Sequence, residues 1–98
     1  MNIEKQKNGK DLLLAPEGRL DTRTAPELES VIQESLDGVE KLTINLTNLE
    51  YISSAGLRVL LSAQKRMNKQ GEMIITGCSE SIMEIFEITG FSDILNIQ

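Results

Sequence analysis

The 98-residue sequence contains no histidine and no tryptophan, and Cys78 is its single cysteine. Without histidine, the Ser-His and Cys-His nucleophile pairs cannot form and the commonest zinc ligand is missing. No glycine-rich loop has the spacing of a dinucleotide-binding or P-loop motif. We therefore expect a protein that is not an enzyme, with no catalytic residues, no bound cofactor and no metal.

A lone cysteine cannot form an internal disulfide, which is typical of proteins in a reducing compartment. We interpret Cys78 as a packed or partly exposed residue at the end of a strand. The first residues, from Met1 to Lys5, lead into no apolar stretch of the kind that a signal peptide has. These features predict a cytoplasmic location.

Clustered positive charge and long hydrophobic runs are also missing. The ten Lys and Arg residues are interleaved with fifteen Asp and Glu residues, which gives a net charge of −5. Binding to nucleic acid or to an anionic membrane surface needs clustered positive charge. Apolar runs such as Leu12 to Ala15 are far shorter than the roughly 20 residues of a membrane span. We expect neither nucleic acid nor a membrane as a partner.

The remaining sequence predicts one domain, residues 1–98, in which strands and helices alternate. Asn8-Gly9 reads as a hairpin turn between the first two strands, and Pro16 with Gly18 is expected to end or bend the second strand. Leu12 to Leu14 form a continuous apolar run, which suggests burial on both faces of the sheet. Residues 47–51 are predicted to be a loop. The predicted strands are residues 3–7, 11–17, 42–46 and 72–76.

Three helices are predicted from apolar spacing and from their end signals. Thr24 and Glu27 have the spacing of a capping box at the first helix start. Ser53-Ser54 opens the second helix and Ser79 caps the third. Gly38, Gly71 and Gly90 are the predicted stops. Residues 94–97 form too short a segment to assign from its pattern.

This order of elements predicts an α/β fold. Strands separated by helices form parallel pairs through right-handed crossovers. We therefore expect a single domain with a mostly parallel sheet of about four to five strands and helices packed mainly on one face.

The serine pair Ser53-Ser54 is the most informative feature of the chain. The first amides of a helix have no partner within the helix, and the helix dipole favours negative charge there. A phosphate would bring about −1.5 to −2 charges to this position without opposing the helix. On the residues alone, however, a serine at a helix start is a common cap and needs no further function.

Three segments resemble STAS-domain anti-sigma factor antagonists. These are YISSAGLRVL at residues 51–60, GRLDTRTA at residues 18–25, and Gly90-Phe91 after an amphipathic helix. The resemblance extends over nearly the whole chain in the right order. It implies a single STAS domain, in which residues 94–97 are a last helical turn or an edge strand.

In that family, the phosphorylated serine lies two residues before the glycine of an Asp-Ser-(Ser/Thr)-Gly pattern. The matching glycine here is Gly56, so the resemblance implies Ser54 as the phosphorylation site. The sequence departs from the pattern with Ser53 at the aspartate position and Ala55 at the Ser/Thr position. Ser53 therefore remains a rival acceptor.

The resemblance also implies partners. An unphosphorylated antagonist binds an anti-sigma factor that is a serine kinase, which frees the sigma factor. Phosphorylation ends the binding, and a PP2C-type phosphatase removes the phosphate. ATP and Mg²⁺ would belong to the kinase. The implied contact surface comprises Asp21, Thr22, Ser53, Ser54, Gly56, Leu57 and Arg58.

Other interpretations stay open at this point. Asp21 and Thr22 also suit a turn, Leu57 a core position and Arg58 a solvated helix surface. The whole chain could be an unphosphorylated STAS scaffold subunit of a lipid-transport ATPase or of another regulatory complex. A small enzyme or nucleotide-binding protein is a third hypothesis, against which the missing histidine and glycine loop argue.

Overall fold

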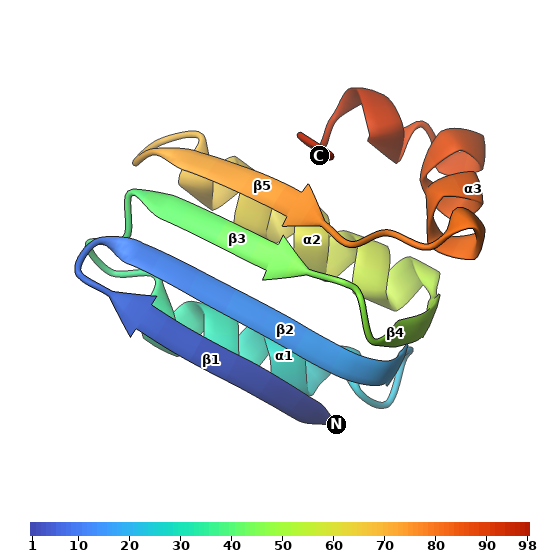
Figure 1. The fold of residues 1–98 in the computed structure, drawn as a ribbon, viewed down its shortest axis with the longest axis horizontal. Helices are drawn as coiled ribbons and strands as arrows, with labels where there is room; N and C mark the ends of the chain where they lie inside the picture. The colour runs from blue at the N-terminus through green and yellow to red at the C-terminus, as the bar shows by residue number, and fades with distance from the viewer.

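The computed structural model describes residues 1–98 as a five-stranded sheet with three α-helices (Figure 1). The strands are β1 (Asn2–Asn8), β2 (Asp11–Leu20), β3 (Lys41–Asn45), β4 (Leu49–Ile52) and β5 (Glu72–Thr76). The helices are α1 (Ala25–Ser35), α2 (Ser54–Met67) and α3 (Glu80–Thr89), followed by the short 3-10 helix η1 (Phe91–Asp93).

The sheet is mostly parallel, as predicted. Its main order is β1-β2-β3-β5, with β1 and β2 antiparallel and the other pairs parallel. Strand β2 has two parallel neighbours in succession. Residues 11–14 pair with β3, and residues 18–20 pair with the short strand β4, with a register shift between Gly18 and Arg19. The end of β2 and the end of β4 therefore lie side by side.

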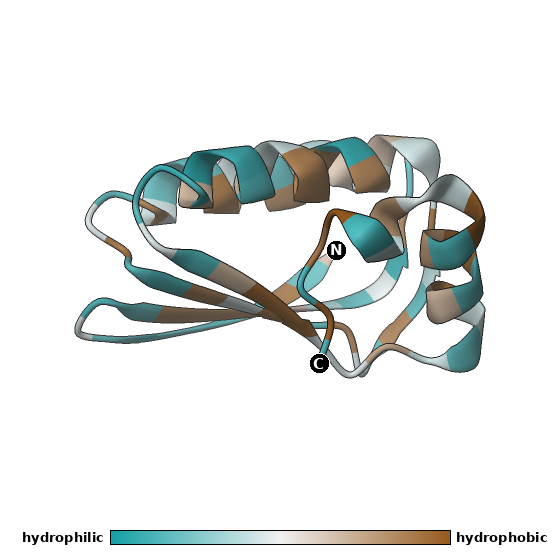
Figure 2. Cartoon of the chain, turned by 90° about the horizontal axis from the view of Figure 1, so that it is seen from above, coloured by the Kyte–Doolittle hydropathy of each residue, from teal (hydrophilic) through white to brown (hydrophobic).

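The helices lie mainly on one face of the sheet, which confirms the predicted architecture (Figure 2). Helices α1 and α2 form a layer over that face, whereas α3 lies at one end of the sheet (Figures 1 and 2). The core of 23 buried residues lies between these layers. Leu12 and Leu14 belong to this core, but Leu13 points to the opposite face and is only half-buried. The expected burial of this run on both faces is therefore wrong for Leu13.

Strand β2 is longer than predicted because it continues through Pro16 and Gly18 to Leu20. Its pairing with β3 ends at Leu14, and its pairing with β4 begins at Gly18. Pro16 falls between these two ladders, where no parallel neighbour needs its missing N–H. The strand can therefore contain a proline without losing a parallel ladder bond.

Two local predictions are wrong. Residues 49–52 form strand β4, although we expected a loop at 47–51. The capping box at α1 does not form, because Thr24 makes no side-chain cap bond to the helix. Its hydroxyl instead donates to the Arg19 carbonyl at 2.7 Å and accepts from the Asp21 N–H at 2.9 Å. Thr24 thus ties the start of α1 back to the end of β2.

The ends of α3 are as predicted. Ser79 accepts a hydrogen bond from the Ile82 N–H at 3.2 Å, and Gly90 ends the helix in the left-handed conformation with φ 81°. After η1, Ile97 forms a parallel bridge with Ile75 of β5, so the last residues end as an edge pairing. None of the helices has both the length and the apolar character needed to cross a membrane.

Candidate functional site

The serine pair joins β4 directly to α2. Ser53 is the N-cap residue of α2 in an extended conformation, and Ser54 is the first residue of the helix. The Ser53 N–H donates to the Leu20 carbonyl at 2.8 Å, which extends the pairing of β4 with the end of β2. The strand that sequence reasoning missed is thus the element that fixes the serine pair in place.

The two serines differ in accessibility. Ser54 is exposed, whereas the Ser53 hydroxyl oxygen is buried and has no hydrogen-bond partner. Ser53 also fails to cap α2 with its side chain. Ser54 is therefore the serine of the pair whose side chain a partner can reach in this conformation.

The first turn of α2 presents free backbone donors around Ser54. The first bond within the helix runs from the Leu57 N–H to the Ser53 carbonyl at 2.9 Å. The amides of residues 54–56 have no acceptor, as expected at a helix start that lacks a side-chain cap. This end of the helix dipole favours negative charge. Arg58 is exposed one turn further along and forms no ion pair.

Gly56 allows α2 to approach the sheet closely. A Cβ atom on Gly56 would lie 2.7 Å from Leu20 Cγ and 2.9 Å from Ile52 Cγ1. Gly56 is buried, and Leu57 is 6% exposed and belongs to the core. Both were expected on the contact surface. The structure places them beneath it, where they pack the helix on the strands.

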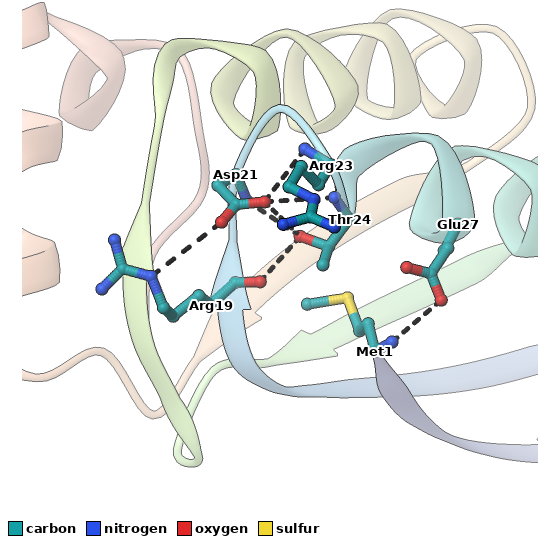
Figure 3. A network of polar contacts seen from close by, with 6 residues as sticks. All are labelled: Met1, Arg19, Asp21, Arg23, Thr24 and Glu27. Atoms are coloured by element: carbon teal, nitrogen blue, oxygen red, sulfur yellow. Dashed lines mark hydrogen bonds and ion pairs between the residues drawn. The ribbon is translucent and has the colours of Figure 1, made fainter.

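Asp21 organises the loop between β2 and α1. Its Oδ1 atom accepts from the N–H groups of Arg23 and Thr24 at 3.0 and 3.1 Å, and it lies 3.2 Å from the Thr24 hydroxyl oxygen (Figure 3). Arg19 Nε lies 3.9 Å from the Asp21 Oδ2 atom. Burial raises the pKa of Asp21, but these hydrogen bonds and the charge of Arg19 outweigh it and leave the pKa below its usual value.

Asp21→Asn is expected to lower the unfolding temperature at pH 7, by an amount that shrinks as the pH falls below about 4. Asn keeps an acceptor oxygen for Arg23 and Thr24, so the change removes mainly the charge. Because the pKa is lower in the folded state, the charge stabilises the fold above the unfolded pKa, and this stabilisation is lost as the pH falls through the folded pKa. Thermal unfolding of both proteins from pH 7 downward measures the effect. A difference that does not depend on pH would contradict it.

A shallow hollow lies between the starts of α1 and α2 and brings Thr22 and Arg58 together. Its volume is about 350 Å³, and it is lined by Thr22, Ala25, Pro26, Glu29, Ala55, Arg58, Val59 and Ser62. The predicted contact residues thus separate into two sets. Asp21, Thr22, Ser54 and Arg58 are partly or fully exposed, whereas Gly56 and Leu57 are buried beneath them. Ser53 is partly exposed, but its hydroxyl oxygen is buried.

Arg19 and Tyr51 were given no role from the sequence, although both lie in segments that carry the family resemblance. The Arg19 guanidinium lies over the Tyr51 ring, 4.3 Å from its centroid.

Cys78 is half-buried, and its burial raises the pKa of its thiol, which suits a packed side chain. No three Cys, Asp or Glu side chains gather where they could hold a metal ion.

Comparison with known proteins identifies the family. Residues 2–98 match the family described as the STAS domain. The chain belongs to the STAS-domain family. This STAS domain is 35% identical over 99 residues to the anti-sigma-B factor antagonist of Staphylococcus aureus (strain NCTC 8325 / PS 47), with 99% of this chain and 92% of that protein covered. The family resemblance is therefore confirmed.

Solved structures show the same fold. The anti-sigma factor antagonist SpoIIAA in its unphosphorylated form matches the STAS domain with a TM-score of 0.78 at 14% identity, covering 99% of this chain and 87% of that chain. The Bacillus SpoIIAA in its phosphorylated form gives a TM-score of 0.77 at 15% identity, covering 99% of this chain and 91% of that chain. At these identities the likeness establishes the fold alone.

Proposed function

We propose that this STAS domain is an anti-sigma factor antagonist switched by phosphorylation of Ser54. In its unphosphorylated form it binds an anti-sigma factor that is a serine kinase and thereby frees the sigma factor. The observation that carries the proposal is the exposed Ser54 hydroxyl at the first turn of α2, beside free backbone amides. Support also comes from the relative at 35% identity, which is named an anti-sigma-B factor antagonist.

The chain contributes an acceptor oxygen to the phosphoryl transfer. Ser54 Oγ forms a bond to the γ-phosphorus of ATP, the bond from that phosphorus to the bridging oxygen breaks, and ADP leaves. The serine proton passes to a base of the kinase, which also holds the ATP and Mg²⁺. Ser54 points outward at the positive end of α2, so the new phosphate is accommodated without unfolding the helix. A PP2C-type phosphatase then hydrolyses the phosphoserine and restores the binding form.

The experiment that tests this proposal is capture of the kinase followed by labelling. The unphosphorylated chain is used as bait in a lysate of its own cells, and the captured kinase is incubated with the chain and ATP. We expect intact mass to rise by one phosphate and peptide mapping to place it on Ser54. Ser54→Ala should stay unlabelled, and Ser53→Ala is the matched control that should be labelled like the wild type.

Two outcomes would contradict the proposal. Full labelling of Ser54→Ala would move the phosphate to another residue, with Ser53 the first to examine. Capture of a transport ATPase in place of a kinase, with no labelling, would favour a STAS scaffold subunit.

A further inference from the structure

We propose that Arg19, stacked on Tyr51, is a preorganised receptor for a carboxylate on the partner protein. This inference deepens the proposed function and rests on it, because the partner is the kinase that reads Ser54. In this proposal the stacked Arg19 and Tyr51 side chains form part of the surface that binds the kinase. The group that binds to Arg19 is an Asp or Glu side chain of the kinase.

Two contacts hold the Arg19 side chain in place. Arg19 on β2 is the register partner of Tyr51 on β4, and its guanidinium lies 4.3 Å from the centre of the Tyr51 ring. Its Nε atom lies 3.9 Å from Asp21 Oδ2. One face of the guanidinium is thus covered by the ring, and the Nε edge is turned to Asp21.

The other edge of the guanidinium is open. The two terminal nitrogens of Arg19 point away from Asp21 (Figure 3), and neither has a hydrogen-bond partner. The side chain of Arg19 is 60% exposed and Tyr51 is 37% exposed, so a partner can reach both. The paired terminal N–H groups match the two oxygens of a carboxylate. Because the side chain is already held, binding loses less conformational entropy than it would with a free arginine.

Most arginines of the chain lie in the two segments that flank the serine pair. The chain carries a net charge of −5, yet three of its four arginines, Arg19, Arg23 and Arg58, lie on the β2–α1 segment and the start of α2, and Arg66 lies at the far end of α2. Glu17, Asp21 and Glu27 line one hollow with Arg19 and Arg23, but only Asp21 lies within ion-pair distance of Arg19, and its Oδ1 is occupied by the loop. Exposed Arg and Tyr are also the residue types that most often dominate binding energy in protein interfaces.

This arrangement couples docking to the switch. Tyr51 is three residues before Ser54 along the chain, at the end of the strand that leads into α2. A carboxylate bound to Arg19 would therefore add negative charge in the same region of the chain as a phosphate on Ser54. Repulsion between the two adds to the loss of binding on phosphorylation.

The single tyrosine of the chain makes the inference testable at one atom. Incorporation of 3-fluorotyrosine labels Tyr51 alone and gives one ¹⁹F resonance. We expect the captured kinase to shift this resonance when it binds the wild type. Arg19→Gln should move the resonance of the free protein and weaken binding of the kinase, measured by calorimetry, at least about tenfold. Arg19→Lys should lose part of the affinity, because an ammonium group keeps the charge without the planar fork.

Arg66→Gln is the matched control. Arg66 lies at the far end of α2 and pairs with Asp37 at 2.8 Å, so its loss removes an arginine away from Ser54 and should leave affinity unchanged. Wild-type affinity of Arg19→Gln, with a Tyr51 resonance that the kinase does not shift, would overturn this inference while the labelling of Ser54 still stands. Failure of the wild type to bind any kinase would overturn the proposed function and this inference with it.

Discussion

A phosphate on Ser54 is expected to weaken binding of the kinase by at least about a hundredfold, or about 2.7 kcal/mol. It adds nearly two negative charges to a surface that meets the partner as a neutral hydroxyl. Juxtaposed like charges cost several kcal/mol at an interface, so one group is sufficient. Calorimetry with fully phosphorylated and unphosphorylated protein measures the change. Because Ser54 is exposed at the positive end of α2, the unfolding temperature should stay nearly the same.

A matched pair of substitutions tests whether the loss of affinity depends on where the negative charge is placed. Ser54→Asp should reproduce part of the loss, since a carboxylate carries less charge than a phosphate. Ser81→Asp places the same charge on an exposed serine in the first turn of α3 and should bind like the wild type. If both variants lost affinity equally, the effect would come from net charge and the role of Ser54 would be contradicted.

The sequence predicted the helices well because their signals are local. Apolar spacing, the serine cap at Ser79 and the left-handed Gly90 each act within one or two turns. Strand β4 lacks such a signal. Leu49–Ile52 has only four residues, with two exposed residues between two buried ones, so it shows no alternation. It is a strand because the end of β2 offers free pairing partners, and that depends on residues distant in the sequence.

The sequence indicates which segment carries the candidate site, but it does not show which side chains of that segment are buried and which are exposed. The sequence places Ser53 and Ser54 side by side with equal polarity, yet the turn from β4 into α2 directs one hydroxyl inward and the other to the surface. The stacking of Arg19 on Tyr51 could not be predicted from the sequence either. It depends on a parallel register that includes a shift after Gly18, and no local pattern encodes that register.

Gly71→Ala is expected to destabilise the fold by about 3 kcal/mol, at the upper end of the usual range for overpacking. A Cβ atom on Gly71 would overlap the carbonyl oxygen of Glu40, with the Glu40 carbonyl carbon only 2.6 Å away. That carbonyl accepts from the Glu72 N–H at 2.9 Å, and the Gly71 N–H donates to the Met67 carbonyl at 2.7 Å. Both backbones are therefore held by hydrogen bonds, and relief of the clash must break one of them.

The loss at Gly71 is large for a domain of this size, whose total stability is of the order of 5–15 kcal/mol. Urea unfolding followed by far-UV circular dichroism measures it. Gly38→Ala is the matched control, because Gly38 has φ 77° but no atom within 4 Å of its Cβ position. It should lose only about 1–2 kcal/mol from backbone strain. Since the Glu40 carbonyl joins the starts of β3 and β5, equal losses for the two variants would mean that this backbone contact contributes nothing to the fold.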